Sequence, residues 1–349
     1  MDLKITKKRL FNLIAYDWIK AVAFSLALVF AWVLLFTTCA TRATDGQQFY
    51  FALYGDVNSV GDDYAMLDDM KKKGDLSYDV LTASVNSITA AGNYSAQYML
   101  NLRSTTHEAD VILLYAGKTN KVVGEETGSG TAEGGEKTDG KDETTENTEK
   151  KSDIEGILSG RYLQTIEDLT AGAKAYLEKF GADFTLAEPT VDDAKIERYF
   201  KAVRAKESRN YKKTYRTEND IKQGVKNEQA RIKKLLEAYL HFNAAVAAAK
   251  DGGNDFLRYY MKPVYENGKE VRKEKRAYGV DLTALNKNVA EDDATKQKVN
   301  DRWSYPDEKG NPQTEGLTLC VSDYVSAQRD LQYEALTFLD YIVKNFSNY

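Results

Sequence analysis

Few residues in this 349-residue chain have the types and spacing that chemistry requires. The catalytic motifs GxSxG and HExxH and the Walker phosphate-binding loop are missing from the sequence. The two histidines, His107 and His241, lie far apart with no cysteine near either one, so a zinc site of the usual kind is not expected. The acidic pair Asp62-Asp63 begins a helical pattern, where carboxylates stabilise the helix dipole. We therefore expect no enzymatic activity, no metal and no cofactor.

One polar loop has part of the spacing of a calcium site. The segment Asp56–Gly61 reads DVNSVG. A calcium loop of the EF-hand type requires Asp or Asn at its fifth position and Glu at its twelfth, where this chain has Val60 and Leu67. A polar loop that follows a strand is the favoured interpretation.

Aromatic and acidic residues near the ends of expected strands are the best candidates for ligand contacts. Doubly wound sheets bind ligands beyond the carboxyl ends of their strands, which here points to Tyr54, Asp56, Tyr115 and Gly117. Trp303 and Tyr305 are expected to face them from an opposite lobe. Tyrosine rings can stack on a sugar or hydrogen-bond to a polar solute. Because the chain has 23 tyrosines, packing in the core is the alternative for each of them.

Three apolar runs separated by two helical patterns would position these candidates. The expected strands are 48–55, 76–83 and 109–117, and the expected helices are 62–73 and 94–103. An order of strand, helix, strand, helix, strand is typical of a doubly wound α/β unit with a parallel sheet. The nearly continuous apolar content of the first and third strands indicates a sheet covered on both faces.

An uncharged apolar stretch near the N-terminus predicts a transmembrane helix. Residues 21–41 contain no charged side chain, and about 31 Å of helix matches the thickness of a bilayer's hydrocarbon core. Arg42 follows the stretch directly, whereas five basic residues precede it. These are Lys4, Lys7, Lys8, Arg9 and Lys20. The positive-inside rule then predicts a cytoplasmic segment 1–20 and a main domain outside the cytoplasm, in a single-pass signal-anchor topology.

Three alternatives to an anchor remain open. A cleaved signal peptide would have a shorter apolar core and a small residue at its exit site. A lipoprotein would carry its lipid on Cys39, but the preceding Phe-Thr-Thr lacks the usual leucine and the small residue before the cysteine. A buried core helix would rarely have 21 residues without a charge.

An acidic, apolar-poor stretch covers residues 124–153. It contains seven Glu, three Asp and four Lys, and no aromatic residue or Val, Ile, Leu or Met. Such a composition cannot bury enough apolar area to offset the entropy of ordering, so we predict a disordered loop. Its net charge is 4 − 10 = −6, and the chain as a whole carries −5, so the rest of the chain sums to +1.

The remainder, 154–349, is expected to be a helix-rich second lobe with a C-terminal return. Apolar residues recur at helical spacing from Ile154 onward, and Thr190 has the spacing of a helix cap. Asn267-Gly268 predicts a hairpin turn. The expected elements are a helical block from 154 to 180, a helix after Thr190, a helix 218–250 ended by Gly252-Gly253, the hairpin 263–271, strands 303–305 and 317–321, and a C-terminal helix 327–346.

A basic run lies within this expected second lobe. Lys201–Arg216 holds seven basic residues and one acidic residue, Glu207. Outside the cytoplasm nucleic acid is not an expected partner, whereas anionic polymers or lipid headgroups could be. A solvated helical face is the favoured interpretation.

The stretch 48–117, within the expected doubly wound lobe 45–120, resembles the N-terminal lobe of extracellular solute-binding proteins of ABC transporters, which are periplasmic-binding-protein-like. The resemblance is carried by QFYFALYG, by LSYDVL followed by YSAQYMLNLR, and by ADVILLYAG, with RYLQTIEDLTAGAKAYLEKF further on. It implies a two-lobed α/β domain that closes on a small polar solute, such as a carbohydrate, and presents it to a transporter permease. In this chain the domain would stay attached to the membrane of a bacterial cell envelope. The alternative is a non-enzymatic envelope scaffold or adaptor that has lost solute binding.

Overall fold

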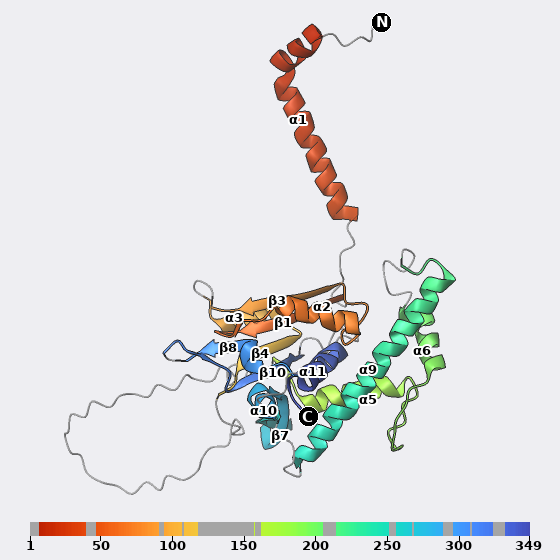
Figure 1. The fold of residues 1–349 in the computed structure, drawn as a ribbon, viewed down its shortest axis with the longest axis vertical. Coiled ribbons are helices and arrows are strands. Elements are labelled where there is room, and N and C mark those ends of the chain that lie inside the picture. The colour runs from red at the N-terminus through yellow and green to blue at the C-terminus, as the bar shows by residue number, and fades with distance from the viewer. Residues whose placement is uncertain are drawn as a thin grey trace, which may run out of the picture. The chain divides into compact units, whose positions relative to one another are not determined.

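A computed structural model gives the fold of the chain (Figure 1). It describes residues 7–39, 47–90, 94–106, 108–117, 157, 162–204, 214–250, 256–266, 269–288, 296–307, 309–323 and 332–349. The acidic stretch 124–153 predicted to be disordered, Gly252-Gly253 and Asn267-Gly268 lie outside the described residues, and so do residues 205–213 of the basic run Lys201–Arg216. The chain divides into two compact units, Met1–Arg42 and Ala43–Tyr349.

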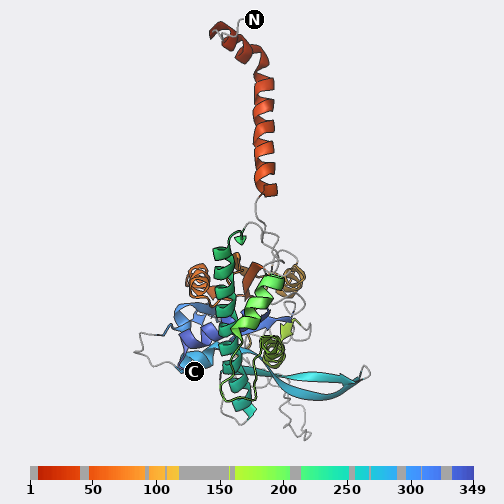
Figure 2. The same ribbon diagram turned by 90° about the vertical axis from the view of Figure 1, so that its right-hand side faces the viewer.

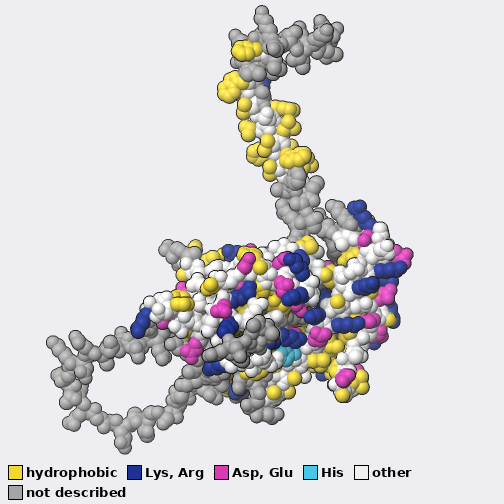
Figure 3. Space-filling view, in the orientation of Figure 1, with side chains coloured by type: hydrophobic (Ala, Val, Ile, Leu, Met, Phe, Trp, Pro, Cys, Tyr) yellow, Lys and Arg dark blue, Asp and Glu magenta, His cyan; other side chains and the backbone are white. Residues whose placement is uncertain are grey.

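The first unit is the helix α1 (Lys7–Cys39). Its window Trp18–Leu35 is long and apolar enough to cross a membrane, and none of that window is buried in the structure. Large apolar side chains such as Phe24 and Phe30 are exposed along it. Figure 3 shows hydrophobic side chains, in yellow, along this helix. An apolar N-terminal helix is confirmed; its topology in a membrane stays a prediction.

The second unit is a mixed α/β domain. In chain order its strands and helices begin with β1 (Gln48–Tyr54), β2 (Asn58–Ser59), α2 (Asp63–Lys73), β3 (Thr82–Ile88), α3 (Ala96–Thr105), β4 (Val111–Tyr115), β5 (Leu163–Gln164), α5 (Ile166–Glu178) and α6 (Asp193–Tyr199). They continue with the π-helix η2 (Phe200–Arg204), α9 (Glu218–Lys250), β6 (Leu257–Glu266), β7 (Lys269–Asp281), α10 (Leu282–Lys287), the 3₁₀-helix η3 (Val299–Asp301), β8 (Trp303–Pro306), β9 (Pro312–Gln313), β10 (Leu317–Ser322) and α11 (Gln332–Phe346).

The main sheet has the order β3-β1-β4-β10-β7-β6, and β5 pairs with β10. The first three strands are parallel, as the doubly wound pattern predicts. The prediction of a parallel sheet fails beyond β4, because β10, β7 and β6 are antiparallel to their neighbours. Strands of the expected second lobe thus continue the sheet of the first, and a two-lobed arrangement is not confirmed. A second, small sheet has the order β2-β8-β9.

Helices cover the two faces of the sheet unequally. Alternate residues of β1 divide between two cores, with Phe49 and Phe51 in the larger and Ala52 and Tyr54 in the smaller. The larger core takes in buried residues of α2, α5, α9, α10 and α11, whereas α3 packs on the smaller core. This alternation is what a sheet with both faces covered requires.

Local signals explain where several elements begin and end. The side chain of Asp62 accepts a hydrogen bond from the Ala65 amide at the start of α2, and Gly74 ends that helix with φ of 77°. That conformation suits glycine, which has no Cβ to clash. The predicted ends of this helix are therefore confirmed.

Three of the expected boundaries are wrong. The second strand is Thr82–Ile88 and not 76–83, because Leu76 and Val80 are buried within turns that precede it. Residues 162–165 are not helical: Leu163–Gln164 is a strand, and α5 begins after Thr165, whose side chain accepts from the Asp168 amide. Asp192, rather than Thr190, caps α6 by accepting from the amides of residues 194 and 195.

The hairpin β6–β7 forms a long two-stranded ribbon that projects from the rest of the domain (Figure 2). We call its outer part, residues 261–266 and 269–276, the arm. Two irregularities in the pairing interrupt the ribbon, one between Arg258 and Tyr259 and one between Val264 and Tyr265. The first lies at the base of the arm. Such bulges bend a ribbon and increase its twist.

Candidate functional site

The residues predicted to contact a ligand lie mostly in the interior. Four of them expose 5% or less of their surface: Tyr54, Tyr115, Trp303 and Tyr305. Tyr115 and Tyr305 are in contact, with ring centroids 4.4 Å apart. Tyr54 belongs to the core on the other face of the sheet, and Asp56 is exposed in the turn after β1. The structure thus brings Tyr115 and Tyr305 together and fills the space around the four aromatic residues with the protein's own side chains.

Trp303 is fixed by a polar contact as well as by packing. Its indole donates to Oδ2 of Asp63 at 3.3 Å, and Nε of Arg302 donates to Oδ1 of the same carboxylate at 3.0 Å. Asp63 is 3% exposed and opens α2. The tryptophan therefore ties β8 to the first turn of α2, which is a structural role that its position supports directly.

A buried arginine lies close to the carboxyl end of β4. Arg258, on β6, is 2% exposed, and its guanidinium donates to the carbonyl of Gly117. It also lies 3.5 Å from the carboxylate of Asp281, which accepts from the Thr283 amide at the start of α10. The cation is matched inside the protein by an anion and a carbonyl, as a buried charge requires. The pattern of apolar runs gives no sign of this residue.

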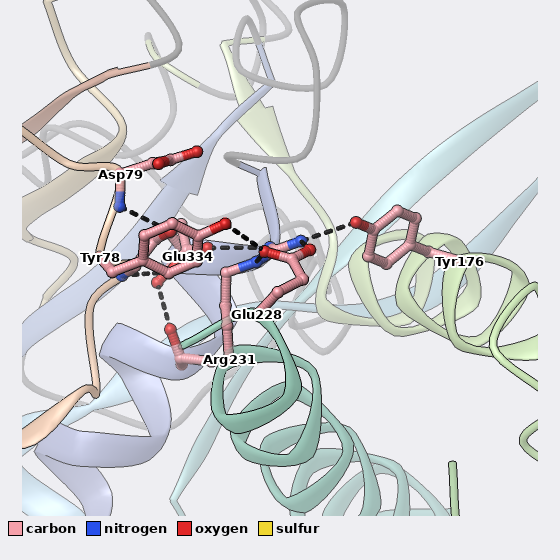
Figure 4. A network of polar contacts seen from close by, with 8 residues as sticks. Tyr78, Asp79, Tyr176, Glu228, Arg231 and Glu334 are labelled. Atoms are coloured by element: carbon pink, nitrogen blue, oxygen red, sulfur yellow. Dashed lines mark hydrogen bonds and ion pairs between the residues drawn. The ribbon is translucent and has the colours of Figure 1, made fainter. Parts of the chain in front are cut away.

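The most extensive buried polar network centres on Arg231 of α9 (Figure 4). Its guanidinium makes two contacts with Glu228, at 3.2 and 2.9 Å, and one with Glu334 of α11, at 3.1 Å. It also donates to the hydroxyl of Tyr176 on α5 at 2.7 Å. The hydroxyl of Tyr78 donates to Glu228 at 2.8 Å. Two-point contact between Arg and a carboxylate is both strong and geometrically specific.

The network joins four parts of the domain. Glu228 is 0% exposed, Glu334 3% and Arg231 4%. The remaining oxygen of Glu334 accepts from the Ser77 amide at 2.9 Å, so the turn before β3 is held to α11. Burial disfavours the charge on Arg231, but attraction by Glu228, and then by Tyr176 and Glu334, raises the pKa of the guanidinium above its ordinary value. An arginine that stays charged and is bonded to two carboxylates and a tyrosine hydroxyl positions helices, and is not suited to transfer protons.

A bulge at the base of the arm is held by a carboxylate. Glu167 of α5 accepts from the Ala277 amide with both oxygens, at 3.0 and 3.1 Å. Burial raises the pKa of Glu167, and these amide contacts act against that rise. Nearby, Lys262 of β6 pairs with Asp168 at 3.1 Å. Helix α5 therefore fixes the direction in which the arm leaves the sheet.

Two buried titratable groups stand apart from these networks. Asp110, which immediately precedes β4, is 4% exposed, and burial raises the pKa of its carboxyl to about 7. The Tyr50 amide donates to it at 2.6 Å and acts against that rise. Burial also raises the pKa of the Cys320 thiol, so this cysteine is a weak nucleophile.

Metal ligands do not gather in the part of the chain that the structure describes. No group of three or more His, Cys, Asp or Glu residues is placed there to hold a metal ion. His241 instead contacts Asp340 through Nδ1 at 2.6 Å, and Lys344 pairs with the same carboxylate. His107 lies outside the described residues.

No protein-family model, curated protein or solved structure matches this chain.

Proposed function

We propose that the protein is a membrane-anchored, non-enzymatic scaffold or adaptor of the bacterial cell envelope. In this proposal α1 crosses the membrane with residues 1–20 in the cytoplasm, and the domain Ala43–Tyr349 binds another protein outside it. The positive charges that precede the apolar stretch support the orientation.

The proposal rests on a contrast between two groups of aromatic residues, one buried in the core and one exposed on α3. The aromatic residues predicted to line a ligand cleft are buried against one another, whereas α3 presents an apolar stripe to solvent. Tyr98 and Leu102 lie one turn apart and are 49% and 47% exposed. Tyr94, which is 55% exposed, stacks on Tyr98 with ring centroids 4.7 Å apart. Exposed aromatic clusters of this kind are enriched at protein interfaces.

Photo-cross-linking in cells that produce the full-length chain tests the stripe. A photoreactive amino acid at position 98 or 102 should give an adduct with the same envelope protein from both positions. The same amino acid at Leu186, which is 56% exposed and distant in sequence, is the control. Adducts at 98 and 102 no stronger than those at 186 would contradict a partner surface on α3.

A second candidate is capture of a small polar solute, such as a carbohydrate, for an ABC transporter permease. One observation favours it: β1 and β4 are parallel neighbours, so Tyr54 and Tyr115 lie near the carboxyl ends of adjacent strands, where doubly wound sheets bind ligands. Thermal unfolding of the full chain in detergent, screened against sugars, peptides and ions, separates the two candidates. A ligand present at about 100 times its dissociation constant stabilises by about 2.7 kcal/mol, so a bound solute should raise the midpoint clearly.

Protease added to intact cells tests the orientation that both candidates share. It should degrade the domain and leave a fragment containing α1. Complete protection of the domain in intact cells, with degradation after lysis, would place it in the cytoplasm and exclude both proposals.

A further inference from the structure

The two faces of the arm differ in how their charges are matched. On one face Glu274 pairs with Arg272 and Arg276, and Lys262 reaches Asp168. On the other face Lys273 lies opposite Pro263, and Lys275 lies opposite Met261. The charges of the first face are therefore satisfied within the domain.

The lysines of the second face have no carboxylate partner among the described residues. Lys273 and Lys275 are exposed and make no ion pair there. Lys275 instead lies over the ring of Tyr259, with Nζ 4.9 Å from the centroid. The whole arm contains six basic and three acidic residues, which gives it a net charge of 6 − 3 = +3. The register also places Glu270 opposite Tyr265 on this second face. The face that we call the lysine face therefore has two lysines and one carboxylate with apolar residues between them, in an arm with a net positive charge.

A projecting ribbon gains little from its own contacts. Residues 269–273 and 275 of β7 are exposed. An isolated two-stranded hairpin is marginally stable in water, and its usual remedy is packing against another part of the protein or a partner. The arm therefore has a surface and an energetic reason to bind something of opposite charge.

The chain itself contains a segment of opposite charge, the acidic stretch 124–153. The described residues on either side of this stretch show where it joins the domain. The stretch 124–153 carries −6. The carbonyl of Gly117, just before it, accepts from Arg258 at the base of β6. Ile157, just after it, is buried in the same core cluster as Tyr260 and Tyr278 of the β6–β7 ribbon.

The end at Gly117 thus lies at the base of the arm, the end at Ile157 lies in the core cluster that the base of the ribbon shares, and the length is sufficient. Residues 118–156 connect the two ends, and a flexible chain of that length has a root-mean-square extension of roughly 35 Å. Ten residues of β6 extend over about 33 Å. We propose that the lysine face of the arm binds the acidic stretch 124–153 of the same chain.

Distance measurement by fluorescence energy transfer in the full chain tests this contact. One dye is attached at Thr144→Cys in the acidic stretch and the other at Val271→Cys near the arm's tip, where Val271 is 50% exposed. Cys39 is replaced by Ser, and Cys320 is buried and stays in place. Transfer should be high at about 0.01 M salt, where the Debye length is about 30 Å, and low at about 1 M, where it is about 3 Å.

Charge reversal identifies the surface. K273E/K275E should reduce transfer at low salt to the high-salt value. The matched control K222E/K226E, which reverses two exposed lysines of α9, should leave transfer unchanged. Replacing the ten acidic residues of 124–153 by their amides should reproduce the effect of K273E/K275E without altering the arm. Equal effects of the arm and control reversals would overturn the proposal, because they would indicate only the overall field of the protein.

The identity of the occupant is tested by mixing. Chains labelled only at position 144 are mixed with chains labelled only at position 271. Transfer within single doubly labelled chains, and none between chains, is expected. Transfer between chains that equals the transfer within one chain would assign the surface to a second copy and overturn the intramolecular contact.

Discussion

The Arg231 network and the lysine face of the arm handle positive charge in opposite ways. Arg231 is buried, and the fold supplies it with two carboxylates and a tyrosine hydroxyl. Lys273 and Lys275 are exposed, and the described part of the domain supplies them with no carboxylate. A charge taken out of water must be matched by the protein itself, whereas an exposed charge costs little and remains available to a partner. A positively charged side chain therefore stabilises the fold where it is buried, and is available for binding where it is exposed.

Removing the buried cation should have the largest effect. Arg231→Met leaves Glu228 and Glu334 buried without their common partner, and we expect a loss of about 3–5 kcal/mol in the free energy of unfolding. Urea unfolding of the full chain in detergent measures it. The control is Lys222→Met on the same helix, where an exposed pair with Glu218 is worth less than about 1 kcal/mol. A similar loss in both variants would contradict the distinction between buried and exposed charge.

Asp110 gives a buried carboxyl group to compare with that buried cation. Its folded pKa of about 7 is raised above the unfolded value, so the protonated carboxyl stabilises the fold at low pH. That contribution is lost as pH rises from about 4 to about 7, by roughly 4 kcal/mol at most. Asp110→Asn, an isostere of the protonated form, should remove this part of the pH dependence. Unfolding curves measured between pH 4 and pH 8 check it, and parallel profiles for the two proteins would show that Asp110 titrates normally.

A change in packing where the β6–β7 ribbon joins the sheet should cost less free energy of unfolding than a change at Arg231 or Asp110. A Cβ on Gly279 would lie 2.5 Å from the Leu319 carbonyl oxygen and 2.9 Å from the sulfur of Cys320. We expect Gly279→Ala to cost about 1–3 kcal/mol, since the strands β7 and β10 must move apart. Thermal unfolding measures it. An unchanged midpoint would mean that this junction accommodates a methyl group.

The smallest effect on stability is expected for the arm. K273E/K275E removes only solvent-exposed charge contacts, those proposed with the acidic stretch 124–153, so the free energy of unfolding should fall by less than about 1 kcal/mol. The same urea experiment checks it. A loss comparable to that of Arg231→Met would show that these lysines serve the domain's own stability, and would remove the contrast between the two regions.

Local patterns in the sequence predict the elements whose stabilising contacts are close in the chain. The helix α2 has its cap at Asp62 and its stop at Gly74, and α9 follows from apolar spacing alone. The second strand is misplaced because Leu76 and Val80 are apolar for a different reason: they anchor turns in the larger core. Periodicity does not distinguish a buried anchor from a strand residue.

Long-range pairing is the part that the sequence conceals. Strand β10 joins the sheet between β4 and β7, and nothing in its residues indicates which strands it will meet. For the candidate site, aromatic content identifies Tyr115 and Tyr305 as residues of interest but does not show that each buries the other. One residue of the Arg231 network can be recognised in the sequence. Glu228 falls on the apolar stripe of α9 that includes Val225, Ile232 and Leu235, where a carboxylate needs a partner.

The place of β10 in the sheet has a consequence for biosynthesis. Leu317 pairs with Tyr115, so the open edge of β4 is completed by residues made about 200 positions later. Chains grow from the N-terminus at roughly 5–20 residues per second, which leaves that apolar edge uncovered for at least about 10 seconds. If α1 is inserted in a membrane early, the nascent domain spends this interval tethered and incomplete. Exported chaperones that protect unpaired strands are then the helpers that its maturation would most require.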